Sequence, residues 1–289
     1  MRLFPRLLGG VASLLFVLSS VESLACTVRV DTPEVVFPLE KMEHQALCRL
    51  AAVVNNHTTY RNVPPLLTPI QKPMYDFLVG HPVMTSVLVR NLDLAGYRII
   101  RTGPDTFQGD DGQGAEGLIT LLYADTTRRV YHVQGSHRGR LFPLITGEAI
   151  VMLNYHAKAE ADGREYVETR ITAYSKIDNP VLATLVKVLH PILRGVVSEK
   201  LTNAFFVVHR LGEIIAVDPE RVYRRVEASS ELDTADVTAL RSLLLPSLKK
   251  GDAGSDYGAE TGAPTVSTSK PRSSIIFHAS DAGMPGVVR

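Results

Sequence analysis

Residues 178–217 read DNPVLATLVKVLHPILRGVVSEKLTNAFFVVHRLGEIIAV, and this stretch decides the fold that we expect. Its apolar residues recur mostly at intervals of three or four, which places them on one face of a helix. They are Leu182, Leu185, Leu189, Ile192, Val196, Ala204, Phe205, Val208, Leu211 and Ile215. Asp178 or Asn179 can cap the start of this helix, and Pro180 suits its first turn. An unbroken helix would span about 55 Å, so Pro191 and Gly195 are expected to bend or divide it.

The segment before this helix has the period of two that is typical of strands. We predict strands over residues 97–101, 106–109, 117–123, 129–134, 145–159 and 164–174. Asp162 and Gly163 favour a two-residue hairpin turn, and that turn would place Tyr155 opposite Arg170 and Leu153 opposite Thr172. Because short turns join the strands, they should form an antiparallel meander, on which the long helix can bury its apolar face.

The rest of the chain is predicted to be mainly helical. We expect a short strand at 27–31, a helix at 33–54, a loop at 55–69 and two short helices at 74–79 and 83–92. Two more helices are expected at 219–226 and 234–245. Residues 26–246 should therefore form a single α+β domain. Residues 247–289, poor in large apolar side chains, are predicted to be a disordered tail.

The order of these elements resembles the START/SRPBCC superfamily, which includes lipid-transfer domains and polyketide cyclase-like proteins. The resemblance is carried by Val28–Val36, which look like an opening strand and helix start, by the Asp162–Gly163 hairpin and by the helix from Pro180. It implies a helix-grip fold, in which an antiparallel β-meander grips a long C-terminal helix, here with extra N-terminal helices. It also implies a hydrophobic ligand, and it supplies no universal catalytic set.

The N-terminus has the pattern of a signal peptide over residues 1–25. Arg2 and Arg6 precede an apolar run, and Ser23-Leu24-Ala25 offers a cleavage site. We therefore expect export to the periplasm or the extracellular space. Cys26 directly follows this site and leaves three alternatives open: a lipid on Cys26, which would place the protein at a membrane surface; a disulfide with Cys48; or a Cys48 that simply packs in a helix.

Candidate ligand contacts come from the expected hairpin and its surroundings. Tyr155, Arg170 and Tyr174 would share one mixed face of the sheet, which either lines a cavity or faces solvent. Tyr131, Arg138 and Arg140 lie near a strand end, where the arginines can bind an anionic head group. Leu189 would contact the ligand from the long helix. These residues suggest a binding site for a hydrophobic small molecule or a lipid.

Other functions have less support in the sequence. His132, Ser136 and His137 offer groups for a small-molecule enzyme, but no known catalytic motif surrounds them. A non-catalytic envelope assembly protein is a third alternative. Asp110-Asp111-Gly112 predicts a tight turn rather than a calcium site. We expect no cofactor and no metal, because no histidine has a zinc-site spacing to the two cysteines. The net charge of +1 gives no indication of nucleic-acid binding.

Overall fold

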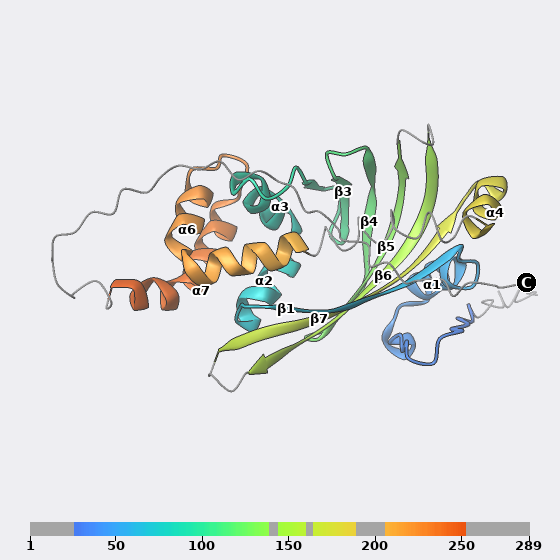
Figure 1. The fold of residues 1–289 in the computed structure, drawn as a ribbon, viewed down its shortest axis with the longest axis horizontal. Coiled ribbons are helices and arrows are strands. Elements are labelled where there is room, and N and C mark those ends of the chain that lie inside the picture. Colours follow the sequence, from blue (N-terminus) through green and yellow to red (C-terminus); the bar gives the residue numbers. More distant parts are fainter. Residues whose placement is uncertain (1–25, 139–143, 160–163, 189–205, 253–289) are drawn as a thin grey trace, which may run out of the picture.

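A single seven-stranded antiparallel sheet forms the centre of the molecule. The computed structural model describes residues 26–138, 144–159, 164–188 and 206–252. The strand order is β1-β7-β6-β5-β4-β3-β2, which confirms the predicted meander and α+β class (Figure 1). The strands are β1 (Thr59–Thr68), β2 (Arg98–Arg101), β3 (Thr106–Asp110), β4 (Ala115–Ala124), β5 (Arg128–His137), β6 (Ile145–Ala159) and β7 (Glu165–Ile177).

Helices cover part of each face of this sheet. They are α1 (His44–Val54), α2 (Lys72–Gly80), α3 (Pro82–Asn91), α4 (Pro180–Val188), α6 (Pro219–Glu227), α7 (Thr234–Asp252) and a helix over residues 206–217. Helices α2, α3, α6, α7 and 206–217, which we call the helical lobe, gather at one end of the molecule (Figure 1). No helix in the described part of the chain is long and apolar enough to cross a membrane.

The first strand is not where the sequence placed it. Residues 27–31 form no strand, whereas residues 59–68, expected as a loop, form β1. Pro64 and Pro65 suggested a loop, but β1 lies at the edge of the sheet, where a missing N–H is tolerated. The pairing of β1 with β7 shifts register between Val63 and Leu66, and the two prolines occupy that irregularity.

The expected helix over 33–54 is also only half correct. Helix α1 begins at His44, and only a short 3-10 turn at Leu39–Lys41 precedes it. Val35 and Phe37 are buried in alternation along a non-helical segment, and Pro33 and Pro38 remove backbone donors from that region. Because α1 precedes β1 in the chain, only α2 and α3 lie between β1 and β2. Residues 28–36, which were expected to open the domain with a strand and a helix start, form neither.

Two hydrophobic clusters lie on opposite faces of the sheet, because side chains alternate along each strand. Leu153, Tyr155, Val167 and Ile171 pack against the helical lobe. On the other face, a second cluster packs beneath α1 and the segment before it. Its strand residues are Val130, Ile150, Met152 and Tyr174. A disulfide joins Cys26 to Cys48 of α1, so of the three alternatives for these cysteines the structure contains the disulfide.

The register of the β6–β7 hairpin differs from the prediction by one residue. Tyr155 pairs with Thr169 instead of Arg170, and Leu153 pairs with Ile171 instead of Thr172. The Asp162–Gly163 turn, which carried the prediction, lies outside the described residues. A shift of one residue moves a side chain to the opposite face. Tyr155 and Arg170 therefore do not share a face of the sheet.

The described parts of the long C-terminal stretch lie far apart along it. Asn179 Oδ1 accepts hydrogen bonds from the backbone N–H groups of Val181 and Leu182, each at 3.0 Å, and so caps α4 as predicted. The helix over 206–217 buries Leu211 and Ile215 in the helical lobe. Pro191, Gly195 and the expected grip of a continuous helix lie outside the described residues.

The predicted helices at 219–226 and 234–245 correspond to α6 and α7. Asp218 Oδ1 caps α6 by accepting a hydrogen bond from the backbone N–H of Arg221 at 2.9 Å. Helix α7 continues to Asp252, past the expected domain boundary at residue 246. The predicted signal peptide and the remainder of the predicted tail lie outside the described residues.

Candidate functional site

A row of four glycines crosses the sheet on the face that carries the helical lobe. Gly109 pairs with Gly117, Gly117 with Gly135, and Gly135 with Gly147, so β3, β4, β5 and β6 each contribute one glycine at the same level. We call this row the glycine trough. Neighbouring strands lie about 4.8 Å apart, so the trough is about 14 Å long between its outermost glycines.

The glycine trough has no room for side chains. A Cβ atom on Gly117 would lie 2.5 Å from the backbone oxygen of Gln134 and 2.8 Å from the Cα of Gly135. A Cβ on Gly135 would lie 2.5 Å from the backbone oxygen of Glu116. Strand backbones approach closely here, which is one of the recurrent reasons for glycine inside a strand.

Apolar side chains enclose the glycine trough. Ile99 of β2 pairs with Gly109, and Ile177 of β7 pairs with Gly147, so an isoleucine closes each end of the row. The next level of the same face carries Ile119, Val133 and Ala149, which pair in sequence across β4, β5 and β6. These residues line a groove of about 510 Å³, together with Tyr97, Ala115, His137, Ile145 and Ser175.

The exposed lining of this groove is mainly apolar, but polar and charged residues also contribute to it, among them Asp110, Asp111, Glu116, Glu148 and Lys176. Burial and the negative charge of Asp111 raise the pKa of Tyr97 above its ordinary value, so its hydroxyl stays neutral at physiological pH. His137 lines the groove, and its Nδ1 is buried without a hydrogen-bond partner among the described residues. An apolar cleft with a small number of polar groups is the usual form of a small-molecule site.

The hairpin residues proposed from the sequence do not come together in this groove. Tyr155 is 1% exposed, and its ring centroid lies 5.1 Å from that of Tyr75 in the helical lobe. Tyr174 is equally buried on the opposite face, where its hydroxyl lies 2.8 Å from Thr32 Oγ1. Arg170 is exposed and its Nε donates to Glu168 Oε1 at 3.0 Å. The three residues occupy three separate environments.

The other proposed contacts are also dispersed. Tyr131 packs against the helical lobe, and burial raises the pKa of its hydroxyl against the opposing charge of Arg129. Arg138 is exposed at the end of β5, where its backbone N–H donates to the backbone oxygen of Gly114 at 2.8 Å. Arg140 and Leu189 lie outside the described residues. None of the described candidates lines the groove.

The histidines and the serine that suggested an enzyme lie on different faces. His132 is 3% exposed on the α1 face, and its Nε2 lies 2.8 Å from Glu148 Oε2. His137 lines the groove on the other side. Ser136 also belongs to the groove lining, although as the neighbour of His137 in β5 its side chain points to the opposite face of the sheet. His132 therefore lies apart from the other two residues named for catalysis, which both line the groove.

The acidic loop at 110–112 is a tight turn, as expected. Asp110 Oδ1 accepts a hydrogen bond from the backbone N–H of Gly112 at 2.7 Å, and Asp111 Oδ1 accepts from those of Gln113 and Ala115. Gly112 has a φ of 68° and Gly114 one of 94°, a backbone conformation that glycine adopts without strain. The carboxylates of Asp110 and Asp111 therefore stabilise the β3–β4 turn by accepting backbone hydrogen bonds.

Comparison with known proteins finds no match in sequence and only distant matches in structure. Neither the protein-family models nor the curated proteins include a match to this sequence. Among solved structures, a conserved protein from Geobacillus kaustophilus is 11% identical, with 54% of this chain and 95% of that chain covered and a TM-score of 0.39. Ara h 8.0201 is 16% identical, with 53% and 98% covered and a TM-score of 0.33.

A third structure, the Mll3558 protein from Rhizobium loti, is 11% identical over 40% of this chain and 79% of that chain, with a TM-score of 0.22. All three similarities are distant. At this level of identity and superposition they carry no argument about a ligand, so the proposal below rests on the groove itself.

Proposed function

We propose that the protein binds a hydrophobic small molecule or a lipid in the groove above the glycine trough. The observation that carries this proposal is the row Ile99–Gly109–Gly117–Gly135–Gly147–Ile177, which gives the groove a floor without side chains between two apolar ends. Five strand spacings separate the isoleucines, about 24 Å. That length suits an elongated apolar ligand lying across the strands.

Burial of apolar surface supplies the affinity in this proposal. Ile119, Val133 and Ile145 would cover the ligand body, at about 25 cal/mol for each Å² of apolar surface removed from water. Tyr97 can donate a hydrogen bond from its neutral hydroxyl, and His137 Nδ1, which has no partner among the described residues, can accept one. A ligand with one hydroxyl or carboxyl group at its end fits this distribution.

The direct test uses extraction and a fluorescent apolar probe. The chain is purified, extracted with organic solvent and analysed for lipids by mass spectrometry, and binding of anilinonaphthalene sulfonate is then titrated. Ala149→Phe fills the groove from β6, and Ala157→Phe places the same ring at an exposed position on the same face of the same strand. Probe binding should weaken at least tenfold in Ala149→Phe and stay unchanged in Ala157→Phe. Equal binding by the two variants would contradict the proposal.

We also propose that the protein is exported. Residues 1–25 have the pattern of a signal peptide, and a Cys26–Cys48 disulfide suits an oxidising compartment. A sulfur in a disulfide cannot carry a lipid at the same time, so we favour a secreted or periplasmic protein over a lipoprotein. Mass spectrometry of the mature chain tests this, because cleavage after Ala25 without added lipid is the expected result.

A further inference from the structure

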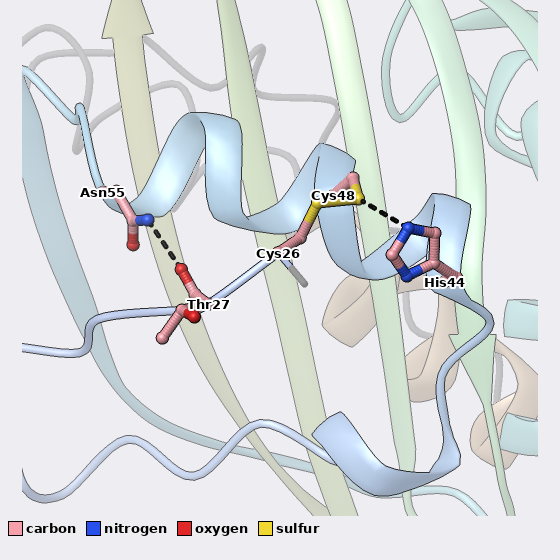
Figure 2. The surroundings of a disulfide bond; sticks show 5 residues. All are labelled: Cys26, Thr27, His44, Cys48 and Asn55. Atoms are coloured by element: carbon pink, nitrogen blue, oxygen red, sulfur yellow. Dashed lines mark hydrogen bonds between the residues drawn. A yellow bond between two sulfur atoms is a disulfide. The ribbon is translucent and has the colours of Figure 1, made fainter. Parts of the chain in front are cut away.

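Three potential metal ligands meet at the start of α1, on the face of the sheet opposite the groove. They are Cys26, His44 and Cys48, and their ligand atoms all lie within 4.8 Å of one another (Figure 2). His44 is exposed and the two cysteines are half-buried, so the cluster is accessible to ions from solvent.

Two of these ligands share one side of the helix. His44 and Cys48 are four residues apart, so they are stacked on the first turns of α1. The distance from His44 Nε2 to Cys48 Sγ is 3.6 Å. Zn–S and Zn–N bonds of about 2.3 and 2.05 Å at a tetrahedral angle give a nitrogen–sulfur separation of about 3.6 Å. The helix therefore holds this pair at the spacing that a zinc ion requires.

Contacts other than the disulfide keep the third ligand nearby. The Asn55 side chain, just after α1, donates to the backbone oxygen of Thr27 at 2.8 Å and accepts from the backbone N–H of Arg29 at 2.7 Å (Figure 2 shows the first bond). Farther along the segment, Val35 and Phe37 are buried beneath α1. Cys26 would therefore remain beside Cys48 after reduction.

We propose that Cys26, His44 and Cys48 form a zinc site when the disulfide is reduced. A dithiol reductant transfers two electrons and two protons to the disulfide, giving two thiols and the cyclic disulfide of the reductant. Zn²⁺ then displaces the two thiol protons and binds two thiolates and His44 Nε2. The sulfurs separate to about 3.8 Å on the ion. Three protein ligands leave one tetrahedral position for water or an added ligand.

This site goes beyond the proposed ligand binding, and in an exported protein it forms only where a reductant opens the Cys26–Cys48 disulfide. The zinc ligands lie on α1 and the segment before it, whereas the ligand groove lies on the other face of the sheet. No zinc-finger spacing is present in the sequence, but His44 stands one helical turn before Cys48. The i, i+4 spacing of a histidine and a cysteine at a helix start was the available signal, and the fold adds Cys26.

Cobalt titration of the full chain tests the proposal. The chain is reduced with a phosphine, desalted without oxygen and titrated with Co²⁺, whose thiolate charge-transfer and d–d absorption bands report tetrahedral sulfur coordination. We expect one Co²⁺ per reduced chain, displacement by Zn²⁺, and no such bands for the oxidised chain. His44→Gln should weaken binding tenfold or more, while His156→Gln, at an exposed histidine on β6, should change nothing.

A thermal measurement separates a true site from a pair of loose thiols. Zn²⁺ should raise the Tm of the reduced chain, because a ligand that binds only the folded state stabilises it. Cys26→Ser should abolish that increase. Equal Co²⁺ binding by the unsubstituted chain and His44→Gln would overturn the proposal. The proposal would also be overturned if reduction abolished the native circular dichroism spectrum and Zn²⁺ did not restore it.

Discussion

One face of the sheet is filled at one end and hollow at the other. Against the helical lobe, Leu153, Tyr155 and Ile171 present large side chains that are at most 4% exposed. Further along the same strands, Gly135 and Gly147 present none, and a groove of about 510 Å³ takes the place of a core. The same strands thus contribute both to a packed core and to a cavity. At the hollow end, glycines on four neighbouring strands leave the floor without side chains, whereas large side chains and the helical lobe fill the other end.

Two isoleucines of β7 give the sharpest test of this contrast. Ile171 and Ile177 are six residues apart and face the same side, but Ile171 is 1% exposed in the helical lobe and Ile177 lines the groove. Ile171→Ala should lower the free energy of unfolding by about 2–5 kcal/mol, because it leaves a cavity in a packed core. Ile177→Ala should cost less than about 1 kcal/mol, since its site is already open. Urea unfolding followed by circular dichroism measures both.

The contrast would fail if the two variants lost similar stability. A large loss in Ile177→Ala would mean that the groove is packed in solution, and the proposed ligand site would lose its support. A selective loss of probe binding in Ile177→Ala, with stability retained, would instead place the ligand at that end of the glycine trough.

A second prediction concerns the glycines themselves. Gly135→Ala places a Cβ atom 2.5 Å from the backbone oxygen of Glu116, so the strands must separate, at a cost of about 1–3 kcal/mol. Gly96→Ala is the matched control, because a Cβ there meets nothing within 4 Å. That variant should be neutral or should stabilise the protein by up to about 1 kcal/mol, because alanine lowers the conformational entropy of the unfolded chain. The Tm values of the two variants are compared by thermal unfolding. Equal values would mean that the backbones of β4 and β5 leave room for a Cβ atom at Gly135.

The sequence was sufficient for the strands near this groove but not for the groove. Alternation identified β2 to β7, and the Asn179 cap was read directly from local chemistry. The glycines 109, 117, 135 and 147 lie in four different strands, and each alone suggests only a bulge or a turn. They become a row when the register is known, and register depends on turn geometry.

The hairpin residues Tyr155 and Arg170 do not come together for the same reason. A two-residue loop at Asp162–Gly163 would have put Tyr155 and Arg170 on one face, and the actual pairing of Tyr155 with Thr169 separates them. The edge strand β1 was missed because Pro64 and Pro65 normally indicate a loop. Only its position in the sheet, which is a tertiary property, makes them acceptable. The alternation of apolar residues therefore predicted the strands, whereas the register of strand pairing decided which side chains share a face.

The reverse side of the glycine trough completes the comparison. Glu148 follows Gly147 in β6, and its carboxylate faces the α1 side, where it contacts His132 Nε2 at 2.8 Å and Lys176 Nζ at 3.4 Å. Burial acts to raise the pKa of Glu148, but the hydrogen bond from His132 and the charge of Lys176 outweigh it, so the pKa lies below its ordinary value. Where one face is hollow, the other has a partly buried polar network.

The smallest effect that we predict comes from this network and depends on pH. Because the folded-state pKa of Glu148 is depressed, its ionised form stabilises the protein above the unfolded-state pKa of about 4.3. That contribution is lost as the pH falls through the lower folded-state value. Glu148→Gln should therefore reduce stability by about 1 kcal/mol at pH 7, the scale of one charged hydrogen bond, and the difference from the unsubstituted chain should shrink below about pH 4. Urea unfolding at pH 7, 5 and 3.5 measures it. A difference that stays constant or grows on acidification would mean that Glu148 is not held ionised by His132 and Lys176.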